Sequence, residues 1–145
     1  MKYLVMLLSL FLMSCNKTLY TSPIGVNIQN NHQIVVDTTQ LKTEWNKMIV
    51  DNNLKGEVSD FRIKTGIDEK TEKKYYYLIS STKNGDLKMA TKLIKHNNQF
   101  FLNTAELIYV ICHGCTISYP EIYDGYWGCE SRDLFNCKKI EIVKS

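Results

Sequence analysis

Residues 74–93, KYYYLISSTKNGDLKMATKL, contain two stretches suited to β-strands with a turn between them. Residues 74–81 are rich in tyrosine. Every second side chain of residues 87–93 is apolar or threonine, as expected of a strand with one buried face. Asn84-Gly85 is typical of a type I′ hairpin turn, whose two central residues need positive φ. The segment therefore predicts an antiparallel hairpin.

The alternation continues on both sides of this hairpin. Before it, apolar and basic side chains alternate over residues 61–64, and residues 68–70 form a polar turn. After it, apolar stretches at residues 100–102 and 106–111 predict a fourth strand, broken near Asn103-Thr104. We expect an antiparallel meander.

A helix is predicted before the meander, at residues 40–54, after a short strand at residues 34–36. The side chains of residues 37–39 supply oxygens suited to its N-cap, and Gly56 is suited to its C-terminal end. One face of the helix is apolar, and we expect it to pack on the sheet; it consists of Leu41, Trp45, Met48 and Ile49.

One helix crossing one antiparallel sheet would bury the apolar faces of both. The predicted fold class is therefore α+β: one helix on an antiparallel sheet of about four strands, with a disulfide-stapled C-terminal tail at residues 112–145. This order of elements resembles the cystatin-like group of α+β folds. That resemblance implies a fold and no function.

The N-terminus has the pattern of an export signal. Lys2 precedes an apolar run at residues 3–12 that is too short to span a bilayer. The run ends in Leu12-Met13-Ser14-Cys15, which resembles the lipobox of bacterial lipoprotein precursors. The resemblance implies that residues 1–14 are a signal peptide and that Cys15 carries a diacylglycerol anchor in the cell envelope. Acidic residues are absent just after Cys15, so we expect the anchored chain to face the periplasm.

Composition predicts one domain behind this anchor. Residues 15–33 are polar and show no periodicity, as in a flexible tether, which leaves residues 34–145 as a single domain. The net charge of +3 is spread along the chain, so no nucleic-acid footprint is visible.

Four further cysteines stand near the C-terminus: Cys112, Cys115, Cys129 and Cys137. In an oxidising compartment this even number favours two structural disulfides, with three possible connectivities. The alternatives are a four-cysteine zinc site, although the second pair is too widely spaced for a zinc knuckle, and a redox pair at Cys112 and Cys115.

Aromatic side chains gather in the same tail: Tyr119, Tyr123, Tyr126 and Trp127. They could form a stacking surface for a sugar, a peptide or a protein, or Trp127 could instead pack inward on a disulfide. The motifs Cys112-His113-Gly114-Cys115 and Gly125-Tyr126-Trp127-Gly128-Cys129 are similar to the endings of small Bacteroidota lipoproteins. That resemblance implies a lipoprotein with no assigned activity.

No hydrolase, metalloprotease or nucleotide-binding motif occurs in the sequence. We therefore predict a lipid-anchored, non-catalytic binding module or inhibitor that needs no cofactor. Its expected partners are the membrane, through Cys15, and an envelope protein or glycan. The alternative is a thiol-redox or zinc-binding protein that uses the four C-terminal cysteines.

Overall fold

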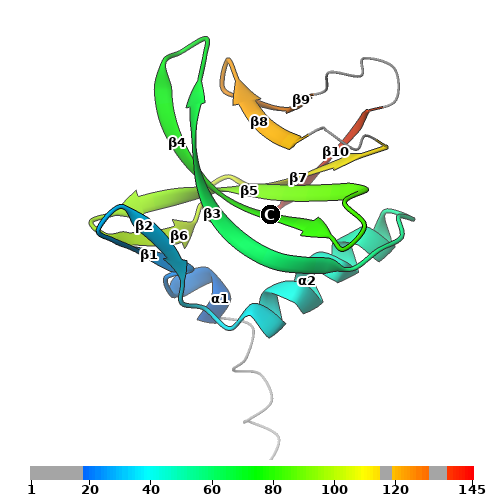
Figure 1. Ribbon diagram of the computed structural model, residues 1–145, viewed down its shortest axis with the longest axis horizontal. Helices are drawn as coiled ribbons and strands as arrows, with labels where there is room; N and C mark the ends of the chain where they lie inside the picture. The colour runs from blue at the N-terminus through cyan, green and yellow to red at the C-terminus, as the bar shows by residue number, and fades with distance from the viewer. Residues whose placement is uncertain (1–17, 115–118, 131–136) are drawn as a thin grey trace, which may run out of the picture.

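The computed structural model describes residues 18–114, 119–130 and 137–145, of which 57% lie in strands and 15% in helices. One antiparallel sheet contains eight strands, and a two-stranded sheet is separate from it (Figure 1). The predicted α+β fold of one helix on about four strands is therefore wrong, because strand residues far outnumber helical ones. Among the described helices, none is long and apolar enough to cross a membrane.

The large sheet is built around strand β5. In chain order the described elements are α1 (Thr18–Thr21), β1 (Gly25–Ile28), β2 (Asn31–Ile34), α2 (Thr38–Asp51), β3 (Val58–Asp68), β4 (Lys73–Thr82), β5 (Leu87–His96), β6 (Gln99–Leu102), β7 (Leu107–His113), β8 (Tyr119–Tyr123), β9 (Tyr126–Glu130) and β10 (Lys138–Lys144). One edge of β5 pairs with β4, which in turn pairs with β3, and the other edge pairs with both β6 and β7. β10 extends the sheet beyond β7, and β1 and β2 extend it beyond β6.

The predicted hairpin is present as β4 and β5, but its turn differs from the prediction. Four residues separate the strand ends, and the loop is closed by a hydrogen bond of 2.9 Å from the Gly85 amide to the Thr82 carbonyl. Gly85 has a positive φ of 78° and Asn84 does not, so the turn is not type I′. Positive φ at both residues of a two-residue loop occurs instead at Gln29-Asn30 and at Asp124-Gly125.

The predicted fourth strand is two strands, β6 and β7, which follow the same edge of β5. β6 ends at Leu102 and β7 begins at Leu107, so the predicted break near Asn103-Thr104 is confirmed. The break divides the sheet into two wings. β6 continues to β1 in one wing, and β7 continues to β10 in the other.

The prediction of a flexible tether at residues 15–33 is wrong from Thr18 onward. Leu19 and Ile24 are buried, and β1 pairs with both β2 and β6. Of the strand predicted at residues 34–36, only Ile34 belongs to β2. A Cβ on Gly25 would lie 2.3 Å from Cδ1 of Ile63, so this glycine allows a close approach to the core. The side chains of these short strands are mostly polar, so the strands show no apolar periodicity in the sequence.

Helix α2 covers one face of the large sheet (Figure 1). Its N-cap is Asp37, as predicted, since Oδ1 accepts a hydrogen bond of 2.9 Å from the Thr39 amide. The predicted apolar face is buried, and Trp45 meets the rings of Phe61 and Tyr109 edge-on at 4.9 and 5.8 Å. This packing forms the larger core.

A smaller core lies on the opposite face of the sheet, beneath the hairpin of β8 and β9. It contains Tyr75, Tyr77, Ala90, Val110, Cys112, Ile122 and Trp127. The described part of the predicted disulfide-stapled tail at residues 112–145 therefore contains regular secondary structure, because it forms strands β8, β9 and β10. The molecule has three layers: helix, large sheet and hairpin (Figure 1).

We expect Trp45→Ala to lower the free energy of unfolding by about 3–5 kcal/mol, because the side chain is fully buried between α2 and the sheet. Lys47→Ala on the same helix is the control. Its ion pair with Asp51 is exposed, and such pairs contribute less than about 1 kcal/mol. Urea unfolding of both variants would measure the difference. Equal losses would contradict the assignment of Trp45 to the core.

Candidate functional site

The β8–β9 hairpin is fixed to the sheet by a disulfide and by aromatic packing. Cys112 of β7 is bonded to Cys129 of β9, with 5.6 Å between their Cα atoms. Trp127 is only 6% exposed and meets Tyr75 and Tyr77 edge-on, at centroid distances of 6.3 and 6.1 Å. The hairpin is therefore held at one end covalently and along its inner face by apolar contact.

Asp68, at the end of β3, holds the tip of the hairpin. Its carboxylate accepts hydrogen bonds from the amides of Asp124 at 2.9 Å and Gly125 at 2.7 Å. It also accepts bonds from the amides of Lys70 and Thr71, which close its own turn. Burial alone would raise the pKa of Asp68, but the amides of Gly125, Asp124 and Thr71 outweigh it and lower the pKa to about 2.

The cysteines of the tail do not pair in the way that a redox motif requires. Cys112 is bonded to Cys129, so it does not form the proposed redox pair with Cys115. A zinc site with four thiolates would need both of these sulfurs free. Cys137 is also disulfide-bonded, whereas Cys15 and Cys115 lie outside the described residues. No group of three or more metal-ligating side chains occurs within the part of the chain that the structure describes.

The four aromatic residues of the predicted binding surface do not form one platform. Tyr123 and Tyr126 lie opposite each other beside the turn of the hairpin and are 55% and 76% exposed. Tyr119 begins β8 at the other end and pairs with Glu130. Trp127 faces the sheet instead. Only Tyr123 and Tyr126 are therefore neighbours on the exposed side.

A small cavity of about 140 Å³ lies beside Tyr126. Trp127, Ile108 and Ile122 supply its apolar part. Its charged side chains come from three other places in the chain: Lys92 of β5, Glu106 before β7 and Glu141 of β10. Glu141 also forms an ion pair of 3.1 Å with Lys139, and both partners are partly exposed. The cavity therefore combines an aromatic side chain with hydrogen-bonding groups of both charges.

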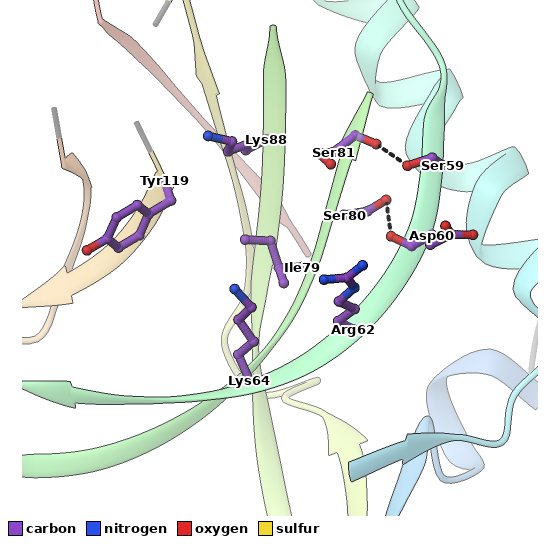
Figure 2. A pocket seen from close by; sticks show the side chains of 9 residues that line it. All are labelled: Ser59, Asp60, Arg62, Lys64, Ile79, Ser80, Ser81, Lys88 and Tyr119. Carbon is purple, nitrogen blue, oxygen red and sulfur yellow. Dashed lines mark hydrogen bonds between the residues drawn. The ribbon is translucent and has the colours of Figure 1, made fainter. Parts of the chain in front are cut away.

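A larger cavity of about 300 Å³ lies at the other end of the hairpin, near Tyr119 (Figure 2). It is basic, and its cations come from two strands: Arg62 and Lys64 from β3, and Lys88 from β5. Sequence reasoning missed this site because the cations are far apart in the chain. Only the pairing of β4 with both strands brings them together.

We expect Asp68→Asn to destabilise the protein at neutral pH, because an amide is a weaker acceptor for the tip amides than a carboxylate is. The folded pKa of about 2 lies below the ordinary value of about 3.9. The stabilisation from Asp68 is therefore complete above about pH 5 and is lost as the pH falls towards 2. Thermal unfolding at several pH values should show the difference between wild type and variant shrinking over that range.

Glu69→Gln is the matched control for this experiment. Glu69 is exposed and occupies the same turn as Asp68. If Glu69→Gln reproduced the pH-dependent difference, the contribution would belong to the turn in general and not to the Asp68 carboxylate.

No protein-family model matches the sequence, and neither a curated protein nor a solved structure is significantly similar to it. The function is therefore inferred from the geometry and chemistry of the chain itself.

Proposed function

We propose that the protein is a lipid-anchored, non-catalytic binding module of the bacterial cell envelope, which binds a saccharide at Tyr126. The observation that carries this proposal is the position of Tyr126, a highly exposed aromatic residue at the rim of a cavity with carboxylates and an amine. The rest of the hairpin supports the proposal, because its contacts with the sheet constrain the backbone on which Tyr126 stands.

A pyranose ring suits this arrangement because it has apolar faces and hydroxyl groups at its edge. An exposed tyrosine offers an aromatic face for the ring, while carboxylates accept hydrogen bonds from hydroxyl groups and an ammonium donates to them. Glu106, Glu141 and Lys92 supply those groups around the cavity. Its volume of about 140 Å³ favours a single ring or the end of a glycan over a large ligand.

Preorganisation favours binding at this place. The Asp68 carboxylate fixes the two turn residues that precede Tyr126, and Trp127 directly after it is buried. A recognition residue on a constrained backbone loses less conformational entropy when it binds a ligand. The disulfide between Cys112 and Cys129 contributes to the same constraint.

The anchoring part of the proposal rests on the lipobox at residues 12–15. The first described helix, α1, begins at Thr18, only three positions after Cys15, and Leu19 is already buried. A lipid on Cys15 would therefore hold the domain close to the bilayer surface, without a long spacer.

We expect the full chain, expressed in a bacterial host with an alkyne fatty acid, to become labelled and to remain with the membrane fraction. Cys15→Ser should abolish the label, because the thiol that receives the diacylglycerol is absent. Cys112→Ser/Cys129→Ser is the control, since it removes other sulfurs and leaves Cys15 in place. Undiminished labelling of Cys15→Ser would contradict the anchor.

We expect Tyr126→Ala to weaken saccharide binding at least about tenfold, as truncation of an aromatic anchor commonly does. Peptidoglycan fragments and oligosaccharides of the outer envelope would be screened first, and any that bind would be titrated by calorimetry. Tyr123→Ala is the control, because Tyr123 is exposed on the same hairpin and does not line the cavity. Absence of any saccharide binding, or equal loss in both variants, would contradict the proposed site.

A further inference from the structure

The smaller cavity lies where the large sheet divides into its two wings (Figure 1). Thr91 of β5 lies opposite Tyr109 of β7, and Leu93 lies opposite Leu102 of β6. Lys92, which lines the cavity, stands between these two pairings, at the point where the edge of β5 changes its partner strand. The cavity therefore borders the connection that joins β6 to β7.

This connection places a carboxylate at the cavity. Glu106 is its last residue, and the Glu106 amide donates a hydrogen bond of 3.2 Å to the Asn103 carbonyl, which closes a turn. The carbonyl of Ile108, two residues later, accepts a hydrogen bond of 2.8 Å from Oγ1 of the buried Thr91. Glu106 and Ile108 both line the cavity together with Lys92. Hydrogen bonds on either side therefore hold the backbone that carries Glu106.

The charged side chains of the cavity differ in whether they already have a partner. Glu141 forms an ion pair of 3.1 Å with Lys139. Neither Lys92 nor Glu106 forms an ion pair or a side-chain hydrogen bond with any residue that the structure describes, and both are exposed. The cavity therefore offers a ligand one ammonium and one carboxylate.

We propose that the saccharide bound at Tyr126 is a zwitterionic amino sugar, which carries an ammonium and a carboxylate on one pyranose ring. The inference rests on the proposed saccharide site and names its ligand class. Glu106 accepts hydrogen bonds from the ammonium of the sugar, and Lys92 donates to its carboxylate. Charge-assisted bonds of this kind are stronger than bonds from the same side chains to neutral hydroxyl groups.

Desolvation favours a ligand that carries both charges. A sugar in a cavity of about 140 Å³ displaces water near both Lys92 and Glu106, because both side chains line it. Removing water from a charged group costs free energy unless a group of opposite charge replaces it. A neutral sugar compensates neither side chain and a singly charged sugar compensates one, whereas a zwitterionic sugar compensates both.

The test compares four hexosamines that share a pyranose ring and differ in charge. Muramic acid has both charged groups, glucosamine has only the ammonium, N-acetylmuramic acid has only the carboxylate, and N-acetylglucosamine has neither. Each would be titrated by calorimetry into the full chain, solubilised in a detergent without a sugar headgroup. Muramic acid should bind about threefold to fivefold more tightly than either singly charged sugar, and N-acetylglucosamine should bind most weakly.

The four affinities separate this inference from the proposed function. If all four sugars bound equally and Tyr126→Ala weakened them all, the zwitterionic ligand class would be overturned and the saccharide site would stand. If none of the four bound, both would be overturned. Tyr126→Ala should weaken the four sugars by a similar factor, because they share the ring that contacts the tyrosine.

Two variants assign the two charges of the ligand to their partners. Glu106→Gln should remove the preference for muramic acid over N-acetylmuramic acid, and Lys92→Gln should remove the preference for muramic acid over glucosamine. Both side chains are exposed, so neither substitution should unfold the protein. Persistence of either preference in its variant would overturn the assignment.

Lys55→Gln and Glu57→Gln are the matched controls. Each removes an exposed charge that lies outside the cavity, so both preferences should remain. Loss of the same preferences in these controls would overturn the proposal, because the effect would then come from the net charge of the protein.

A zwitterionic amino sugar could be free or be the end of a glycan. A disaccharide of N-acetylglucosamine linked to muramic acid separates these sources. Tighter binding of the disaccharide than of muramic acid would assign a glycan end, and tighter binding of muramic acid would assign a free sugar. Failure of both to bind would overturn the proposal.

Discussion

The fold depends on the hydrogen bonding of β5 along both of its edges. This strand pairs with β4 on one side and with β6 and β7 on the other, so every wing of the large sheet is connected through it. Its side chains also alternate between the two cores, with Leu87, Met89 and Leu93 towards α2 and Ala90 towards the hairpin. The sheet therefore needs a cover on each face, because apolar side chains emerge from both.

Helix α2 and the β8–β9 hairpin, which cover the two faces of the sheet, are held in place by different interactions. Helix α2 is held by a large apolar core, whereas the hairpin has a small core and is reinforced by the Cys112–Cys129 disulfide and the Asp68 carboxylate. A small element that is fixed at several points can keep exposed side chains in defined positions. Both cavities adjoin this hairpin, one near Tyr119 and one beside Tyr126, and both candidate sites therefore depend on its attachment.

Local patterns predicted the parts of the fold whose signal lies within one element. The apolar face of α2, its Asp37 cap, the strands on either side of Asn84-Gly85 and the break after Leu102 all follow from such patterns. The strands at both ends of the chain were missed. Residues 25–34 are too polar to show apolar periodicity, whereas residues 138–144 do alternate, with Ile140 and Ile142 half-buried, and that signal could have revealed β10.

The sequence by itself determined helix α2, the strands on either side of Asn84-Gly85, the lipobox resemblance at Cys15 and the even number of cysteines in the tail. The tertiary structure decided what those elements bring together. It paired Cys112 with Cys129, turned Trp127 inward and placed Arg62, Lys64 and Lys88 around one cavity. The physical reason is strand register: residues far apart in the chain become neighbours only through the hydrogen bonds between strands, and no local periodicity contains that information.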